Sequence, residues 1–132
     1  MGRRRIAPSC SGNLRHAIEL EPDNVVAYTN RAFAFAELKQ HEDAIKDYTK
    51  AIALEPGIVR AYLGRGLTHV ELKQYEDAIK DYTKAIALEP GNVRAYLWRA
   101  EIYRALGQYD KAKEDEETAA KLRSEEEARA SL

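Results

Sequence analysis

The sequence is poor in the residues from which disulfide frameworks and membrane spans are built. It contains one cysteine, Cys10, so an intrachain disulfide cannot form and a reducing compartment is the default expectation. No apolar run approaches the length that crosses a bilayer. The opening residues, MGRRRIAPSC, lack the apolar core of a signal peptide. We therefore expect a soluble protein of the cytoplasm, with the nucleus left open, and no membrane partner.

Residues arranged for catalysis are also lacking. The three histidines, His16, His41 and His69, share no metal-ligand spacing, and one cysteine cannot complete a zinc site. The serines lie only near the two ends of the chain, and the glycines stand singly. Neither a serine triad nor a phosphate-binding loop is therefore indicated. We expect a protein that is not an enzyme, with no metal and no cofactor.

No excess of charge of one sign is present either. Lysine and arginine number 21 against 22 aspartates and glutamates, and the formal net charge of −1 gives no general attraction to nucleic acid. The arginines near the start are few and lack interleaved aromatic residues, so nucleic-acid binding is not expected. With 45% hydrophobic and 33% charged residues, the chain can bury a core beneath a well-solvated surface.

What the sequence does contain is a repeat. Residues 37–57 read ELKQHEDAIKDYTKAIALEPG and residues 71–91 read ELKQYEDAIKDYTKAIALEPG, so the two stretches differ only at His41 and Tyr75. They are offset by 34 residues, and a further proline precedes them at the same spacing. A fixed period of this length is typical of helical repeat arrays.

The period divides most of the chain into three full units, each with two helices. The units are predicted at residues 25–58, 59–92 and 93–126. Residues 13–22 match the second helix of a unit that lacks its first helix, and residues 1–12 form an irregular basic segment before it. Residues 127–132 are a polar tail or the end of a capping helix. We interpret the chain as a truncated or alternatively begun form of a longer array.

Helical periodicity is clearest in the second helix of each unit. In the first unit, small and aromatic residues recur three and four positions apart, as in Ala44, Tyr48 and Ala51. Asn24 and Asn92 stand where they would cap the helices that follow them. Aspartates recur in phase on the charged side of the second helices, and we predict that they face solvent. They are Asp47, Asp81 and Asp115.

This pattern resembles the tetratricopeptide repeat family over roughly residues 14–123. The residues that carry the resemblance in the second unit are Tyr62, Gly66, His69, Ala78, Tyr82, Ala85 and Pro90. The resemblance implies an all-α fold, a right-handed superhelical array of antiparallel helix pairs, in which the first helices line a concave groove for a partner peptide. The third unit departs from the pattern at Glu116 and Ser124, and such polar changes are expected in a unit that ends an array.

The groove positions implied by the resemblance differ among the units, whereas the packing positions recur. The candidate partner-binding residues are Asn30, Phe33, Arg60, Leu63, Leu67, Arg94, Leu97 and Trp98. Arg60 and Arg94 can hold a carboxylate through paired hydrogen bonds, and the apolar members offer contact surface. The leading prediction is a non-catalytic adaptor that binds a protein or peptide with an acidic or carboxylate group. In the other interpretation, Trp98 and the leucines hold neighbouring helices together and the arginines are merely solvated.

Two further functions are kept as alternatives. The unpaired helix within residues 13–22 would expose an apolar face, which a second copy of the chain could cover to give a dimer or a head-to-tail scaffold. Asn30 also matches the asparagine of the carboxylate clamp with which some co-chaperone repeats hold chaperone tails, and Arg60 could replace a clamp lysine. Gly64 stands in the place of the clamp arginine, so the clamp is incomplete.

Overall fold

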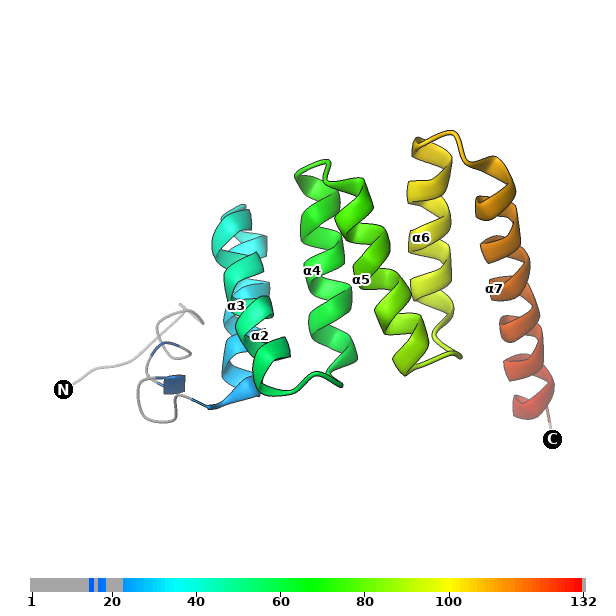
Figure 1. Cartoon of the computed structure of the whole chain (residues 1–132). Helices are drawn as coiled ribbons and strands as arrows, with labels where there is room; N and C mark the ends of the chain where they lie inside the picture. The colour runs from blue at the N-terminus through cyan, green and yellow to red at the C-terminus, as the bar shows by residue number, and fades with distance from the viewer. Residues whose placement is uncertain (1–14, 16, 19–22, 132) are drawn as a thin grey trace.

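Six helices follow one another in the part of the chain that the structure describes, and they pair into one row. The structure, a computed structural model, describes residue 15, residues 17–18 and residues 23–131. The helices are α2 (Val25–Glu37), α3 (His41–Leu54), α4 (Val59–Glu71), α5 (Tyr75–Leu88), α6 (Val93–Ala105) and α7 (Tyr109–Ala130). Figure 1 shows them as antiparallel neighbours stacked in chain order. The basic segment at residues 1–12 and most of the partial repeat at residues 13–22 lie outside the described residues.

The helices begin where the local residue chemistry allows it. The side-chain Oδ1 of Asn24 accepts a hydrogen bond from the backbone N–H of Ala27 at 3.0 Å, and Asn92 does the same for Ala95 at 3.1 Å. Each bond satisfies a donor that the first turn of a helix leaves unpaired. The predicted N-caps of α2 and α6 are therefore confirmed. Helix α4 follows Ile58 and has no side-chain cap.

Within each helix pair the chain turns through one residue in the left-handed conformation. This residue is Lys39, Lys73 or Gly107, with φ of 65°, 60° and 78° respectively. The N–H of Lys39 donates to the carbonyl of Ala36, and the next N–H donates to the carbonyl of Phe35. This is a Schellman motif, which satisfies carbonyls at the end of the helix. Two of these three turns hold a lysine in a conformation that favours glycine.

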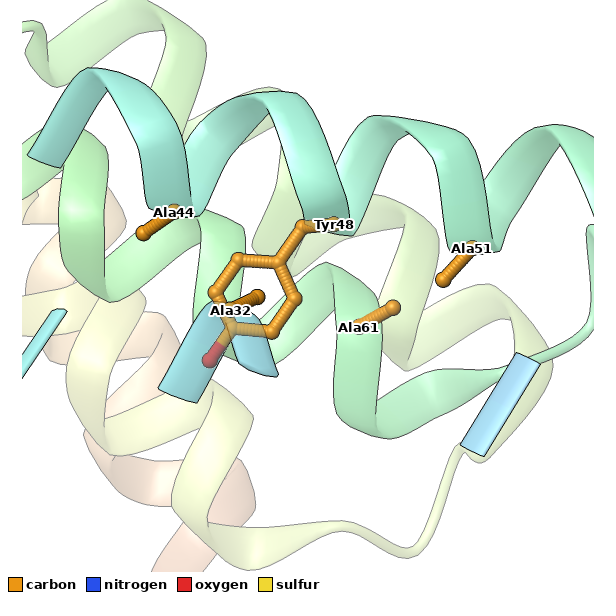
Figure 2. Close-up of a cluster of buried hydrophobic side chains, with 5 residues drawn as sticks. All are labelled: Ala32, Ala44, Tyr48, Ala51 and Ala61. Atoms are coloured by element: carbon orange, nitrogen blue, oxygen red, sulfur yellow. The ribbon is translucent and has the colours of Figure 1, made fainter. Parts of the chain in front are cut away.

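Alanines and tyrosines form the core between the helices. Ala32, Ala44, Ala51 and Ala61 are completely buried, and the Tyr48 ring lies among them (Figure 2). The small side chains let the helix backbones approach one another, and the ring fills the space that remains. A second cluster repeats this arrangement one unit later around Tyr82.

The in-phase aspartates are buried, so the prediction that they face solvent is wrong. Each one forms a two-point ion pair with an arginine of the first helix in the same pair. The pairs are Arg31–Asp47, Arg65–Asp81 and Arg99–Asp115, with shortest N···O distances of 2.6, 2.8 and 2.7 Å. We call these three pairs the Arg–Asp ladder. The guanidinium neutralises the carboxylate and satisfies both of its oxygens, which is why the acid can leave water.

The ladder arginines also join one helix pair to the next. Arg65 donates from Nη1 to Thr49 Oγ1 in α3 at 3.1 Å, and Arg99 donates to Thr83 Oγ1 in α5 at 3.0 Å. The Cζ of Arg65 also lies 5.9 Å from the centroid of the Tyr62 ring in its own helix, within cation–π range. One side chain thus contacts its own helix, its partner helix and the preceding pair.

The last helix, α7, is the longest of the six and is rich in charge. It runs through Ser124, where the earlier units have a proline, and ends at Ala130. In the slot of the earlier tyrosines it has Glu116, whose carboxylate accepts hydrogen bonds from Arg104 at 2.6 and 2.8 Å. An exposed ion pair therefore replaces a buried ring in the third unit. None of the helices in the described residues is both long enough and apolar enough to cross a membrane.

Candidate functional site

The first helices of the three pairs, α2, α4 and α6, carry the residues that differ among the units. In α4 these are Arg60, Gly64, Leu67 and Glu71, spaced four, three and four apart, so they share one side of the helix. The matching residues are Val26, Asn30, Phe33 and Glu37 in α2, and Arg94, Trp98, Glu101 and Ala105 in α6. We call these three stripes, with the adjoining Leu63 and Leu97, the groove face. Two hollows open on it.

The first hollow has a volume of about 470 Å³, and we call it the apolar hollow. Phe33 and Leu67 line it and remain 58% and 41% exposed, so large apolar side chains from adjacent units lie open together. The Tyr48 ring passes so close to Gly64 that a Cβ there would lie 2.3 Å from Tyr48 Cζ. Burial of this ring raises the pKa of Tyr48 to about 12. His41, which also lines the hollow, has a buried Nδ1 with no hydrogen-bond partner among the described residues.

Carboxylates surround the apolar hollow. Glu37 and Glu71, the last residues of α2 and α4, line it together with Glu101 of α6. Within the described part of the chain, none of these three acids lies within ion-pair distance of a cationic side chain, although Lys39 lines the same hollow. Three carboxylates and one lysine line this hollow, so this end of the groove face carries net negative charge.

The second hollow has a volume of about 550 Å³ and lies by the N-terminal end of α6. Leu63 and Leu97 supply its apolar part, and Arg94 and Arg123 supply its cations. The other charged residues around it are Glu89 and Glu126. Arg123 belongs to the extended end of α7, and the sequence prediction did not include it. The signal that could have found it is Ser124, because the absence of the usual proline lets the helix continue.

Two of the predicted groove residues, Asn30 and Arg60, are linked directly. Arg60 donates from Nη2 to Asn30 Oδ1 at 3.2 Å, and the guanidinium is exposed. The bond joins α4 to α2, so polar groups of adjacent units can act on one ligand group.

Trp98 is half-buried and contacts the core. Its ring centroid lies 6.0 Å from that of Tyr82, with the ring planes tilted by 46°, and it packs on the cluster that contains Ala78 and Ile102. The Cζ of Arg94 lies 5.8 Å from the centroid of the Trp98 ring. Trp98 therefore connects α5 and α6, and the large apolar side chains of the groove face that are most exposed are Val26, Phe33 and Leu67.

Two models of the tetratricopeptide repeat (TPR) match the chain, over residues 25–57 and residues 69–114. The first TPR of Spaghetti (RPAP3), solved bound to the HSP90 peptide SRMEEVD, has 34% sequence identity to this chain, and the two structures superpose with a TM-score of 0.72. That match covers 74% of this chain and 77% of the other. The chain belongs to the tetratricopeptide repeat family.

Other solved structures are similar to this TPR protein over more of its length. The crystal structure of MamA has a TM-score of 0.85 at 27% identity, with 92% of this chain and 70% of that chain covered. The second TPR of Spaghetti (RPAP3), also bound to the HSP90 peptide, has a TM-score of 0.72 at 27% identity. That match covers 85% of this chain and 96% of the other. A comparison with curated protein sequences finds no match. The predicted all-α array of antiparallel helix pairs is confirmed.

The TPR framework separates the residues that build the fold from those free to recognise a ligand. The Arg–Asp ladder and the buried alanines recur in each unit and hold the pairs together. The groove face differs at most positions from one unit to the next, and its identical pairs are Glu37 and Glu71, Arg60 and Arg94, and Leu63 and Leu97. No group of three or more His, Cys, Asp or Glu side chains suited to a metal ion occurs in the described ranges. What this face offers chemically is apolar contact, hydrogen bonds and charge.

Proposed function

We propose that this TPR protein is a non-catalytic interaction module that binds an extended segment of a partner protein along the groove face. The observation that carries the proposal is the apolar hollow, where Phe33 and Leu67 lie exposed together over about 470 Å³. Apolar groups gathered in a hollow mark binding surfaces, whereas single exposed ones do not. A partner side chain that fills the hollow removes both from water, which contributes about 25 cal/mol per Å² of apolar area buried.

The position of the hollow in the repeat supports the same proposal. Phe33, Leu67 and Glu101 occupy equivalent positions in the three units, yet they differ in size and charge. Residues that stack one pair on the next must be alike, because each pair packs on its neighbour in the same way. Residues that contact a partner have no such constraint. Recognition is therefore assigned to the first helices, and stacking to the recurring residues.

Selection from a phage-displayed library of random twelve-residue peptides tests this function. We expect the wild-type protein to enrich a set of peptides. With the Phe33→Ala/Leu67→Ala variant the enrichment should fall about tenfold, because its hollow offers less apolar surface. The control variant Lys46→Ala/Lys80→Ala changes exposed residues of the second helices and should enrich the same peptides. All three proteins must melt within a few degrees of one another. Equal enrichment on the hollow variant, or none on the wild type, would refute the proposal.

Binding of a chaperone tail is a second candidate function. Both TPR structures of Spaghetti (RPAP3) are bound to the HSP90 peptide SRMEEVD, and the linked Asn30 and Arg60 supply two clamp-like polar groups here. Against it, Gly64 occupies the place of the clamp arginine, and the Tyr48 ring fills the space that a side chain there would need. Calorimetric titration with the peptide SRMEEVD tests whether the protein binds a chaperone tail. Saturable micromolar binding that Asn30→Ala abolishes would make this the function, and no heat of binding would remove it.

Self-assembly through residues 13–22 remains a prediction, because most of that segment lies outside the described residues. Light scattering over a concentration series tests it. A mass that rises with concentration, and returns to that of a monomer when residues 1–22 are deleted, would support it. A constant monomer mass would exclude it.

A further inference from the structure

The groove face is polarised in charge along the direction of its helices. In α4 one stripe begins with Arg60, continues through Leu67 and ends with Glu71. Each neighbouring stripe shares one end of this order, since α6 has Arg94 in its first turn and α2 ends with Glu37. At the other ends, the α2 stripe begins with Val26 and the α6 stripe finishes with Ala105. Cations thus lie at the start of α4 and α6, apolar groups in the middle of α2 and α4, and carboxylates at the ends of α2 and α4.

We propose that the partner segment is itself bipolar: an extended peptide with an acidic group at one end, an apolar middle and a basic residue at the other end. The acidic group lies against Arg60 and Arg94, and the basic residue lies among Glu37, Glu71 and Glu101. This inference rests on the proposed function, and it specifies the chemistry of the segment that the same face binds.

Helix α4 carries its charges against its own dipole. A helix has partial positive charge at its N-terminus and partial negative charge at its C-terminus, so a base in the first turn and an acid in the last turn are both unfavourable. Helix α4 has both, with Arg60 and Glu71. The second helices α3 and α5 have the favourable charge at their start, where Glu42 and Asp43, or Glu76 and Asp77, lie in the first turn. Helix stability therefore does not account for the charges of the groove face, whereas a bipolar ligand does.

Among the described residues, the charges of the groove face have no ionic partner, as is also true of most lysines and glutamates on the surface. The ladder arginines and Arg104 each have a carboxylate at 2.6 to 2.8 Å. Among the described residues, Arg60 is hydrogen-bonded to the neutral amide of Asn30, and Arg94 lies over the Trp98 ring, with no carboxylate within ion-pair distance of either. The acids around the apolar hollow likewise have no cation within ion-pair distance in the part of the chain that the structure describes. Charges of both signs are thus available to a ligand at the two ends of one face.

The length of α4 sets the spacing of the charges on the ligand. Arg60 and Glu71 are eleven residues apart, so at about 1.5 Å per residue their backbones are separated by about 16 Å along the helix axis. An extended peptide advances about 3.4 Å per residue, and five residue steps cover the same distance. The middle of such a peptide lies over Gly64 and Leu67, where the apolar hollow opens. A hexapeptide with charged ends and leucines between them therefore matches the face.

Three blocked hexapeptides test the proposal on the full chain. They are acetyl-Lys-Ala-Leu-Leu-Ala-Asp-amide, its charge-reversed form acetyl-Asp-Ala-Leu-Leu-Ala-Lys-amide, and the neutral acetyl-Gln-Ala-Leu-Leu-Ala-Asn-amide. Binding is followed through the fluorescence of Trp98, the single tryptophan of the chain, which lies on the groove face. We expect one of the two charged peptides to bind about tenfold more tightly than the neutral one in low salt. This advantage should largely disappear in 1 M salt, because the pairs are exposed.

A charge swap then identifies the acidic end of the face. In the Glu71→Lys variant, the preferred charged peptide should bind no more tightly than the neutral one. The same peptide with glutamate in place of its lysine should then bind this variant about tenfold more tightly than the neutral peptide does. The matched control Glu117→Lys makes the same charge change at an exposed position of α7 and should leave the preference unchanged. Glu71→Lys also reverses an unfavourable helix-end charge, so its melting temperature should equal or exceed that of the wild type.

The outcomes separate this inference from the function on which it rests. If the library enriches peptides through Phe33 and Leu67 but neither charged hexapeptide surpasses the neutral one, the bipolar ligand is wrong and the interaction module stands. The inference is also wrong if the preferred charged peptide still binds the Glu71→Lys variant more tightly than the neutral peptide does. If no hexapeptide binds and the library gives no enrichment, both proposals fail.

Discussion

Replacing Asp81 by asparagine should destabilise the protein by about 2–3 kcal/mol. Removing one partner of a buried ion pair generally costs about 3–5 kcal/mol, because the other charge remains without compensation. Arg65 is 21% exposed and keeps its hydrogen bond to Thr49, so we expect the effect to lie below that range. At about 4 °C per kcal/mol for a domain of this size, the melting temperature should fall by about 8–12 °C.

Thermal unfolding followed by circular dichroism at 222 nm measures the effect. Asp77→Asn, in the first turn of the same helix, removes an exposed carboxylate and should change the stability by less than about 1 kcal/mol. The double variant Arg65→Met/Asp81→Leu removes both charges and should recover most of the loss, because no unpaired charge remains. A loss below about 1 kcal/mol in Asp81→Asn, or one no larger than in Asp77→Asn, would refute the structural role of the ladder.

Three further perturbations have defined outcomes. Lys73→Gly should raise the free energy of unfolding by about 0.5–1 kcal/mol, since φ of 60° at this turn favours glycine, and a lower melting temperature would contradict the Schellman geometry. Gly64→Ala should cost about 1–3 kcal/mol, because its Cβ would lie 2.3 Å from the Tyr48 ring; Gly57→Ala, which has nothing within 4 Å, is the control and should be nearly neutral. Alkaline pH should unfold the protein, because burial raises the pKa of Tyr48 from 10.0 to about 12. The free energy of unfolding that depends on the neutral phenol is fully present below pH 10 and is lost between pH 10 and pH 12. Absorbance at 295 nm reports all eight tyrosines, so its final part should change together with the circular dichroism. Complete tyrosine ionisation near pH 10 with the helices intact would rule this out.

The fold could be predicted from the sequence because the information was local and repeated. The 34-residue offset of two nearly identical stretches indicates stacked units, and Asn24 and Asn92 cap helices as their positions predict. Such signals act within one turn of the chain, so a single sequence is enough to read them.

The buried aspartates could not be found in the same way. Asp81 is polar and lies among lysines in the sequence, and a periodicity argument places such a residue in solvent. Its burial depends on Arg65, which belongs to another helix and lies sixteen residues earlier. The available signal was that both residues recur in phase in each unit, as a matched pair would.

The exposed side of the first helices could be predicted from the sequence, whereas the contacts of its residues could be predicted only in part. The resemblance to TPR proteins indicated which side of each first helix lies open, and Phe33 and Leu67 are exposed there. The contact of Trp98 with Tyr82 depends on how α5 and α6 pack, and the place of Arg123 depends on how far α7 continues. Both are properties of tertiary structure that residue identity does not specify.

The contacts of α4 explain how this helix can carry unfavourable charges at both ends. Placing Arg60 at the start of α4 and Glu71 at its end costs about 0.3–1 kcal/mol each in helix stability. Arg65, in the middle of that helix, compensates by joining α4 to Asp81 of its partner helix and to Thr49 of the preceding pair. Because the stabilising contacts lie on the packed side, the open side can be adapted to a ligand without loss of the fold. A surface shaped for stability alone would have the opposite charges at both ends of α4, so a higher melting temperature in Glu71→Lys, together with weaker binding of a bipolar peptide, is the expected sign of a functional surface.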